Sequence, residues 1–261
     1  MKESSALTDR QRTEASVYDA RVRDSLAGIR DEDLIVDPNV PPFPNREHVE
    51  FLTFAFERMG DLRGARVLEV GSGTGTLSVY LALRGAQVTG IDISEENCRL
   101  AERRAAANGI TDNTRFVAIP IEQLADEAGS YDAIIGNQVL HHFELPVAMP
   151  NIGRLLRPGG HALFCEPVLL LPDTLRRLRD SRPVKRLIPK KVDTPTERSV
   201  SVEDVRTIRQ TFPGVKLHPF QLLARLQNYV ELPDRVFAML EGLDRRLLRF
   251  PGLSRLSRFV V

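Results

Sequence analysis

The chain has 261 residues, of which 42% are hydrophobic and 27% are charged, and its net charge at pH 7 is +1. This composition is typical of a folded globular protein and excludes disordered, collagen-like and disulfide-rich classes. No apolar run approaches the ~20 residues that a membrane span needs. The two cysteines, Cys98 and Cys165, lie in expected core elements. We therefore expect buried thiols and a reducing, cytoplasmic setting.

The charge is unevenly distributed along the chain. Residues 172–261 carry 19 Lys and Arg against 10 Asp and Glu, whereas the rest of the chain is acidic overall. A basic half is typical of proteins that contact nucleic acid or an anionic membrane. The alternative is a solvated, arginine-rich face without a partner.

The first 46 residues predict a helical N-terminal cap. We expect a helix over residues 14–26, followed by a proline-rich loop at 38–44 that cannot be regular helix. Residues 48–59 then have apolar side chains at helical spacing, which predicts a second helix.

From residue 66 onward, short apolar strands alternate with helices. This alternation is typical of βαβ units with right-handed crossovers, and hence of a parallel sheet. Ser94 is the expected N-cap of the helix over 95–108. Strands are expected at 66–70, 87–93, 115–119, 131–137 and 161–166, and helices at 77–84, 95–108 and 145–156, the last closed by a turn at 157–160.

The regular alternation stops after Pro167. We expect a partly helical, arginine-rich stretch at 169–191, a helix over 202–212 capped by Ser201, and an edge strand over 215–222, which contains Pro219. An amphipathic helix is predicted at 233–249, with Val236, Leu240, Leu243 and Leu247 on one face, and a last strand at 257–261.

These elements predict an α/β fold with a mostly parallel, seven-stranded, Rossmann-like sheet flanked by helices. The expected division is an N-terminal helical cap over 1–46, a nucleotide-binding core over 47–168, and the remainder of the sheet over 169–261. Helical N-terminal and C-terminal insertions are expected to close over a substrate as a lid.

The most informative motif is a glycine-rich turn that follows the strand over 66–70. Its sequence is Glu69-Val70-Gly71-Ser72-Gly73-Thr74-Gly75. Glycines between a strand and a helix let the backbone approach a ligand where a Cβ would collide. The spacing departs from the dinucleotide fingerprint, and no Gly-Lys-Ser/Thr is present, which excludes a P-loop.

A second motif ends the next strand. Asp92, in the stretch Gly90-Ile91-Asp92-Ile93-Ser94, lies 17 residues after Gly75. A carboxylate at this strand end can accept both ribose hydroxyl protons. The alternative interpretation is that Asp92 only caps the following helix.

Together these motifs resemble the class I S-adenosylmethionine-dependent methyltransferases, in the family that includes ubiquinone, menaquinone and natural-product methyltransferases. The stretches Tyr131–His142 and Leu155–Gly160 match that family too, and the resemblance covers roughly residues 47–168. It implies S-adenosylmethionine as the cofactor, with S-adenosylhomocysteine as the product and no metal.

The resemblance also implies roles for single residues. Glu69 would lie near the methionine ammonium, Asp92 would bind the ribose, and Ile93 would pack on the adenine. Asn137 would face the methionine and the reacting methyl. The full implied set is Tyr18, Glu69, Gly71, Ser72, Gly73, Gly75, Asp92, Ile93, Ile121, Glu122 and Asn137.

One position departs from the family's pattern. Pro120 stands where relatives usually place an aspartate that receives the adenine amino group. Proline has no side-chain acceptor and no backbone N–H. We therefore expect the Ile121 backbone, with Glu122 or a water, to take over this contact.

Two adjacent histidines follow the fourth strand. Either His141 or His142 is a candidate general base, because imidazole titrates near neutrality. The alternative is that one ring packs in the loop and shapes the substrate wall. Glu166, at the end of the fifth strand, is expected to hydrogen-bond substrate or to pair with an arginine of the C-terminal region.

The resulting hypothesis is an enzyme that methylates a small, largely apolar metabolite or natural product at O, N or C. The alternatives are a nucleic-acid methyltransferase and a cofactor-binding enzyme that does not methylate, such as a cyclase. Nucleic-acid binding is not expected, since the chain has no tryptophan and only 4 tyrosines for base stacking. Peripheral membrane contact through the basic C-terminal region stays open, as does the choice between monomer and homodimer.

Overall fold

The computed structural model describes residues 7–26, 28–43, 46–166, 200–224, 226, 230, 232–250 and 258–260. The chain divides into two compact units, each treated by itself below. Unit 1 comprises residues 1–139 and 144–164, and unit 2 comprises residues 140–143 and 165–261. The helical stretch expected at 169–191 lies outside the described residues.

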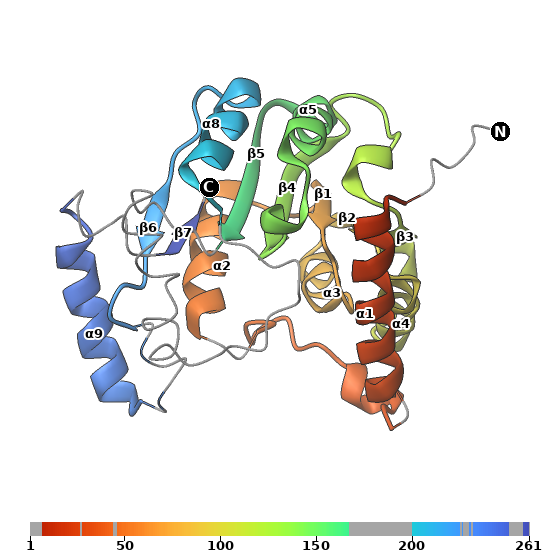
Figure 1. The fold of residues 1–261 in the computed structure, drawn as a ribbon. Coiled ribbons are helices and arrows are strands. Elements are labelled where there is room, and N and C mark those ends of the chain that lie inside the picture. The colour runs from red at the N-terminus through yellow and green to blue at the C-terminus, as the bar shows by residue number, and fades with distance from the viewer. Residues whose placement is uncertain are drawn as a thin grey trace. The chain divides into compact units, whose positions relative to one another are not determined.

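The strands of the described residues form one sheet (Figure 1). The pairs β1–β2, β1–β4 and β2–β3 are parallel, whereas β7 is antiparallel to β5 and β6. The expected mostly parallel, Rossmann-like sheet is confirmed, although β6 and β7 have only three residues each. The order is β3 (Thr114–Ala118), β2 (Gln87–Asp92), β1 (Arg66–Val70), β4 (Tyr131–Asn137), β5 (Leu156–Glu166), β7 (Arg258–Val260) and β6 (His218–Phe220).

The core of unit 1 lies around β1 and β4. Val67, Leu68, Ile134 and Ile135 are fully buried, as near-continuous apolar runs are in a parallel sheet covered on both faces. Glu69 interrupts this run with a buried carboxyl group. An ionisable side chain is therefore held inside an apolar strand, next to the glycine-rich turn.

Helices flank the strands in both units. The expected caps are confirmed: Ser94 Oγ accepts the Asn97 N–H at 3.1 Å, and Ser201 Oγ accepts the Asp204 N–H at 3.2 Å. Unit 1 contains α1 (Asp9–Leu26), α2 (Arg46–Met59), α3 (Thr76–Leu83), α4 (Glu95–Ala107) and α5 (Leu145–Leu155), with short 3₁₀ turns η1 (Asp31–Leu34), η2 (Thr111–Asn113) and η3 (Ile121–Gln123). Unit 2 contains η4 (Leu140–His142), α8 (Val202–Thr211) and α9 (Asp234–Leu247).

The first helix begins earlier than expected, at Asp9 rather than residue 14. The Thr8 N–H donates to Gln11 Oε1 at 3.0 Å, and the Gln11 N–H donates to Thr8 Oγ1 at 3.3 Å. This reciprocal pair has the geometry of a capping box and starts the helix one turn upstream.

Two strand boundaries also differ. Strand β5 begins at Leu156, so residues 157–160 form its exposed beginning rather than a turn before residue 161. Pro158 is tolerated there because a proline at a strand start interrupts no interior ladder. Strand β6 is shorter than the expected 215–222. It begins only at His218, and it ends at Phe220 because Gln221 has a φ of +52° that takes the chain out of the sheet.

Two residues of the expected apolar face of α9 are exposed. Val236 is 37% exposed and Leu243 is 39% exposed, whereas Phe237 and Asp244 are the buried side chains of this helix. The packed face is thus rotated relative to the apolar stripe, which leaves apolar side chains in contact with solvent.

Both cysteines are free and buried, as expected. No helix in the described part of the chain combines the length and the apolar character needed to cross a membrane.

Candidate active site

The glycine-rich turn is tied to the end of β2. The backbone N–H groups of Gly71 and Ser72 both donate to the Ile91 carbonyl, at 2.8 and 2.9 Å. A Cβ on Gly71 would lie 2.6 Å from Val139, so glycine is required there. At Gly73, with a φ of +50°, a Cβ would meet no atom within 4 Å. The turn is therefore packed on one side and open at Gly73.

Asp92 connects this turn to the next helix. One carboxylate oxygen accepts the Gly73 N–H at 2.8 Å, and the other accepts the Ser94 N–H at 2.9 Å and Asn97 Nδ2–H at 3.1 Å. Ser94, and not Asp92, provides the side-chain cap of α4. Burial raises the pKa of Asp92 against these three bonds, which favour the carboxylate. Asp92, at the carboxyl end of β2, thus holds the glycine-rich turn through the Gly73 N–H.

Glu69 lies beside the same turn and is 4% exposed. Its Oε2 accepts a hydrogen bond from Ser78 Oγ at 2.5 Å. Burial raises the pKa of Glu69 to about 8, and the nearby Asp92 charge contributes in the same direction. Glu69 therefore holds a proton at neutral pH unless a cation comes to it. Ser78, on α3, was not among the expected site residues.

Two buried polar atoms near the turn and η3 have no hydrogen-bond partner among the described residues. They are Ser72 Oγ and Glu122 Oε2. Burial raises the pKa of Glu122, against a hydrogen bond from its own backbone N–H that lowers it. Buried polar groups in folded proteins are nearly always paired, so atoms of this kind indicate where a ligand completes the structure.

The Ile121 carbonyl, expected to contact the adenine, already accepts a hydrogen bond within the protein. It accepts Asn151 Nδ2–H at 2.6 Å, and Asn151 also donates to the Leu124 carbonyl at 3.1 Å. This leaves Glu122 as the better acceptor next to Pro120. The adenine contact next to Pro120 stays a prediction.

The N-terminal helix contributes to the same region. Helix α1 packs against α4 (Figure 1). Asp19 Oδ1 accepts the Ser94 Oγ–H at 2.5 Å and the Glu96 N–H at 3.3 Å. Tyr18, the neighbour of Asp19, is half-buried and has the Arg21 guanidinium 5.6 Å from its ring centroid. Asp19 was not among the expected site residues, since nothing in the local sequence relates it to residue 94.

The remaining expected cofactor residues lie at strand ends. Ile93 and Asn137 are half-buried, at the carboxyl ends of β2 and β4. Gln138, directly after Asn137, has a φ of +54°. Because β1, β2 and β4 are parallel, their carboxyl ends share one edge of the sheet. Unit 1 thus brings together Glu69, the turn, Asp92 and Asn137 along that edge.

Unit 2 pairs the first histidine with Glu166. His141 Nδ1 lies 2.8 Å from Glu166 Oε2, and the Leu140 N–H donates to Glu166 Oε1 at 2.7 Å. The side chains of His141 and Glu166 are 1% and 0% exposed. His142 is half-buried, with its ring centroid 4.1 Å from that of His141. Among the described residues Glu166 thus pairs with His141 and the Leu140 N–H, and its expected contact with substrate or with an arginine of the C-terminal region stays a prediction.

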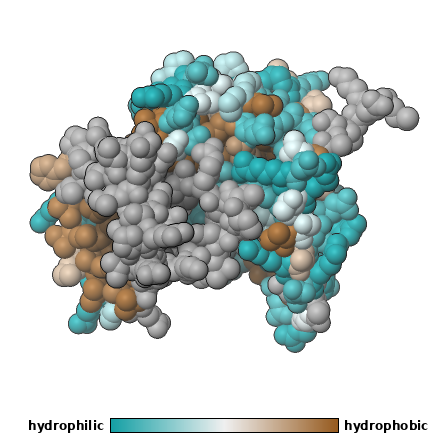
Figure 2. All heavy atoms as spheres, in the orientation of Figure 1, coloured by the Kyte–Doolittle hydropathy of each residue, from teal (hydrophilic) through white to brown (hydrophobic). Residues whose placement is uncertain are grey.

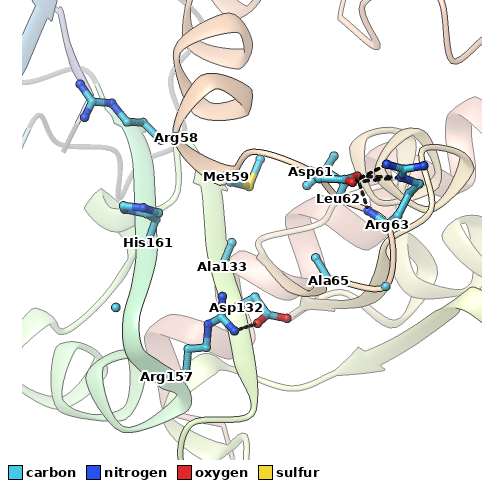
Figure 3. A pocket seen from close by; sticks show the side chains of 12 residues that line it. Arg58, Met59, Asp61, Leu62, Arg63, Ala65, Asp132, Ala133, Arg157 and His161 are labelled. Carbon is cyan, nitrogen blue, oxygen red and sulfur yellow. Dashed lines mark hydrogen bonds and ion pairs between the residues drawn. The ribbon is translucent and has the colours of Figure 1, made fainter.

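A pocket of about 380 Å³ lies elsewhere in unit 1, at the amino ends of β1, β4 and β5 (Figure 3). Its charged groups are largely satisfied: Arg157 pairs with Asp132 at 2.6 Å, and Arg63 pairs with Asp61 at 2.7 Å. None of the expected site residues lines it. Ligands of such sheets bind at the carboxyl ends of the strands, so this pocket is not the cofactor site.

The described residues contain no group of three His, Cys, Asp or Glu side chains that could hold a metal ion. They do fit an adenosyl amino acid. The backbone is open at Gly73, an acidic side chain ends β2, and a buried carboxyl group stands near the turn. The fold and this edge define a class I S-adenosylmethionine-dependent methyltransferase domain.

Comparisons with known proteins agree with this class. Residues 67–160 match the family described as a methyltransferase domain. The ubiquinone biosynthesis O-methyltransferase of Bordetella bronchiseptica is 39% identical over 110 residues, which are 41% of this chain and 45% of that protein. The enzyme of the same description from Acinetobacter baylyi is 29% identical over 199 residues, which are 73% and 83% of the two chains. The chain thus spans slightly less than half the length of the Bordetella relative.

Solved structures share the fold. Geranyl diphosphate C-methyltransferase from Streptomyces coelicolor has a TM-score of 0.57 at 16% identity, covering 98% of this chain and 97% of that chain. The [4+2]-cyclase SpnF has a TM-score of 0.60 at 19% identity, covering 97% and 94%. At these identities the likeness concerns the fold alone. The sequence match to the methyltransferase domain family is the one over residues 67–160.

Proposed function

We propose that this chain transfers the methyl group of S-adenosylmethionine to a small, largely apolar acceptor. The observation that carries the proposal is the bond between Asp92 and the Gly73 N–H, which joins a carboxylate to an open glycine turn at the ligand edge of the sheet. The cofactor supplies an activated methyl group, so the protein mainly has to align and desolvate the reactants.

Six of the expected residues have separate roles in this proposal. Asp92 accepts the ribose hydroxyls, and Glu69 meets the methionine ammonium. Glu122 accepts the adenine amino group, for which its buried, unpartnered oxygen is suited. Ile93 packs on the adenine, and Asn137 faces the methionine. Tyr18, on α1, covers the cofactor from the side on which Asp19 holds α4.

The pair formed by His141 and Glu166 supports an acceptor that loses a proton. A carboxylate that accepts from Nδ1–H fixes the neutral imidazole with its Nε2 lone pair available, which is the form a general base requires. We propose that His141 Nε2 removes the proton of an acceptor hydroxyl as that oxygen takes the methyl group. Relatives named as O-methyltransferases support the choice of oxygen.

The deciding experiment is calorimetric titration of the purified chain with S-adenosylhomocysteine, followed by turnover with S-adenosylmethionine. Alkylated phenols, alcohols and amines serve as acceptors, and S-adenosylhomocysteine release is measured together with the methylated product. Release with product formation supports methyl transfer. Acceptor conversion without release identifies a cyclase-type use of the same fold, and no binding of S-adenosylhomocysteine overturns the proposal.

A nucleic-acid acceptor makes a different prediction. Binding to RNA or DNA through the basic C-terminal region would weaken steeply as the salt concentration rises. The same titration with a duplex and a single strand at 50 and 200 mM salt tests this alternative, and we expect no binding in either condition.

We place the activity in the cytoplasm, which the two free thiols support. We also propose that α9 rests on an anionic lipid surface. Met239 is 58% exposed beside Val236 and Leu243, and Figure 2 shows the hydrophobic patch that covers this helix. Four exposed arginines lie on the same helix or just after it: Arg235, Arg245, Arg246 and Arg249. An apolar stripe bordered by arginines is the pattern of an interfacial helix.

Vesicle co-sedimentation tests the lipid contact. The chain is expected to bind phosphatidylglycerol vesicles at low salt and to leave phosphatidylcholine vesicles unbound. The double variant Met239→Ser, Leu243→Ser should lose this binding, whereas Val147→Ser, which changes a 53% exposed valine on α5, should not. Equal binding by both variants, or burial of the patch in a homodimer detected by light scattering, contradicts the proposal.

A further inference from the structure

A buried glutamine ends strand β6. Gln221 is 1% exposed, and neither its side-chain oxygen nor its side-chain nitrogen has a hydrogen-bond partner among the described residues. An amide that gives up water without gaining a partner destabilises the fold. The other buried atoms of this kind considered above, Ser72 Oγ and Glu122 Oε2, lie where the cofactor is expected. Gln221 is thus an unpartnered group that the cofactor does not explain.

The backbone at this residue is also strained. Its φ of +52° is shared, among non-glycine residues of the described part of the chain, only by Gln138. Glycine and asparagine adopt this conformation far more readily than glutamine does. Residues held in sparsely populated conformations cluster at ligand-binding positions, because the surrounding structure must enforce them.

Asp244 holds the backbone next to Gln221 in place. Its carboxylate, on α9 and 3% exposed, accepts the backbone N–H groups of Leu222, Leu223 and Ala224 at 2.9, 2.8 and 3.0 Å. Hydrogen bonds to a charged acceptor are the strong ones, and three of them fix the turn that follows Gln221. The backbone that carries the side chain of Gln221 is therefore rigid.

The strand register relates Gln221 to the proposed base. Glu166 of β5 stands opposite Phe259, and Phe259 stands opposite Pro219 of β6. Both β5 and β6 are antiparallel to β7, so they run in the same direction. Pro219 consequently lies level with Glu166, two strand spacings away, roughly 10 Å, and Gln221 follows two residues later, just after β6 has ended.

We propose that Gln221 binds a second polar group of the acceptor, at the end away from the hydroxyl that His141 deprotonates. The group must both accept from the glutamine nitrogen and donate to its oxygen, because both atoms lack a partner. A carboxamide or lactam meets this requirement with two bonds to one glutamine. The acceptor class is a hydroxyaryl amide, in which one ring separates the two groups. This inference rests on the proposed function.

Three probes of one shape test the assignment. They are 4-hydroxybenzamide, which donates and accepts at its substituent, 4'-hydroxyacetophenone, which only accepts, and 4-ethylphenol, which does neither. Each is titrated by calorimetry into the full chain saturated with S-adenosylhomocysteine. The wild type should bind them in that order, with about a tenfold loss of affinity for each hydrogen bond removed.

The variant Gln221→Leu should bind all three with similar affinity, keep its affinity for S-adenosylhomocysteine, and unfold at the same or a higher temperature. Gln210→Leu, which changes an exposed glutamine on α8, should keep the wild-type order. Should the leucine variant fail to fold, Gln221→Asn keeps an amide that tolerates a positive φ, and its shorter side chain should lower the preference for 4-hydroxybenzamide.

A wild-type order that persists in Gln221→Leu, or a wild type that binds none of the probes or shows no preference, overturns the inference. Loss of S-adenosylhomocysteine binding in the wild type would instead overturn the proposed function, so the two failures are distinguishable.

Discussion

His141 Nδ1 and Glu166 Oε2 lie 2.8 Å apart, and both side chains are almost completely buried. The first prediction concerns this pair. Glu166→Gln replaces an oxygen that accepts from Nδ1–H by an amide that can present a donor, so His141 loses its fixed tautomer. The rate of methyl transfer should fall about 10- to 100-fold, a part of the roughly 10²- to 10⁴-fold that general-base catalysis contributes, because the imidazole itself is kept.

Single-turnover rates on the acceptor with the highest activity measure the effect. Glu203→Gln, at an exposed position of α8, is the matched control and should leave the rate unchanged. If Glu166→Gln lowers the affinity for S-adenosylhomocysteine by the same factor as the rate, the pair has a structural role only.

Asp92→Asn should weaken S-adenosylhomocysteine binding about 10- to 100-fold, measured by calorimetry. The asparagine oxygen can still accept one of the bonds now made to Gly73 and Ser94, so the turn is retained, while the charged acceptor for the ribose hydroxyls is lost. Asp112→Asn, at an exposed position of η2, is the control. Unchanged affinity in Asp92→Asn would remove the ribose role from this carboxylate.

The raised pKa of Glu69 predicts that the protein releases a proton when the cofactor binds. Burial raises the pKa of Glu69 to about 8, so the free protein holds the proton at pH 7, whereas a bound ammonium favours the carboxylate. Titrations at pH 7 in two buffers of different ionisation enthalpy should show proton release that disappears above pH 9. In Glu69→Gln the apparent enthalpy should no longer depend on the buffer through this group. Equal proton release in the variant and the wild type would show that another group is responsible.

The same carboxyl group predicts how stability depends on pH. The unfolded chain loses this proton near the ordinary value of 4.5 and the folded chain near 8, so the folded state binds more protons between these limits. Stability from this group is therefore complete below pH 4.5 and is lost as the pH rises toward 8, by about 1 kcal/mol per pH unit. Urea unfolding of Glu69→Gln should lack this decline, and parallel curves for the two proteins would contradict it.

The adenine contact is tested by loss and rescue. Glu122→Leu removes the buried oxygen without a partner and should weaken S-adenosylhomocysteine binding about tenfold. Adding Pro120→Asp to this variant places a carboxylate where relatives have one, and affinity should return. If Glu122→Leu binds normally, or if the double variant is not improved, the adenine lies elsewhere.

The sequence predicted the part of the molecule whose local patterns are strong. The strand, turn and acid from Glu69 to Asp92 appear in the chain in the order in which they meet in space, because a parallel βαβ unit places successive strand ends at one edge. The caps Ser94 and Ser201 were predictable for the same reason, since a cap acts on groups only three residues away.

Long-range partners were not predictable in this way. The bonds from Asp244 to the backbone at residues 222–224 and from Glu166 to His141 join residues 20 to 26 positions apart, and no periodicity relates them. The burial of α9 was not predictable either, because apolar spacing marks a stripe without saying what covers it. The strained backbone at Gln221 has no sequence pattern, since glutamine is not a turn residue.

The hydrogen bond from Ser94 to Asp19 spans 75 positions of the chain and has a practical consequence for what counts as a domain. The stretch that similarity recognises, residues 67–160, omits the helix that supplies this carboxylate. A fragment cut at those limits would carry every motif and still leave the start of α4 without its partner. The stretch recognised by sequence similarity is thus shorter than the folding unit, which includes α1.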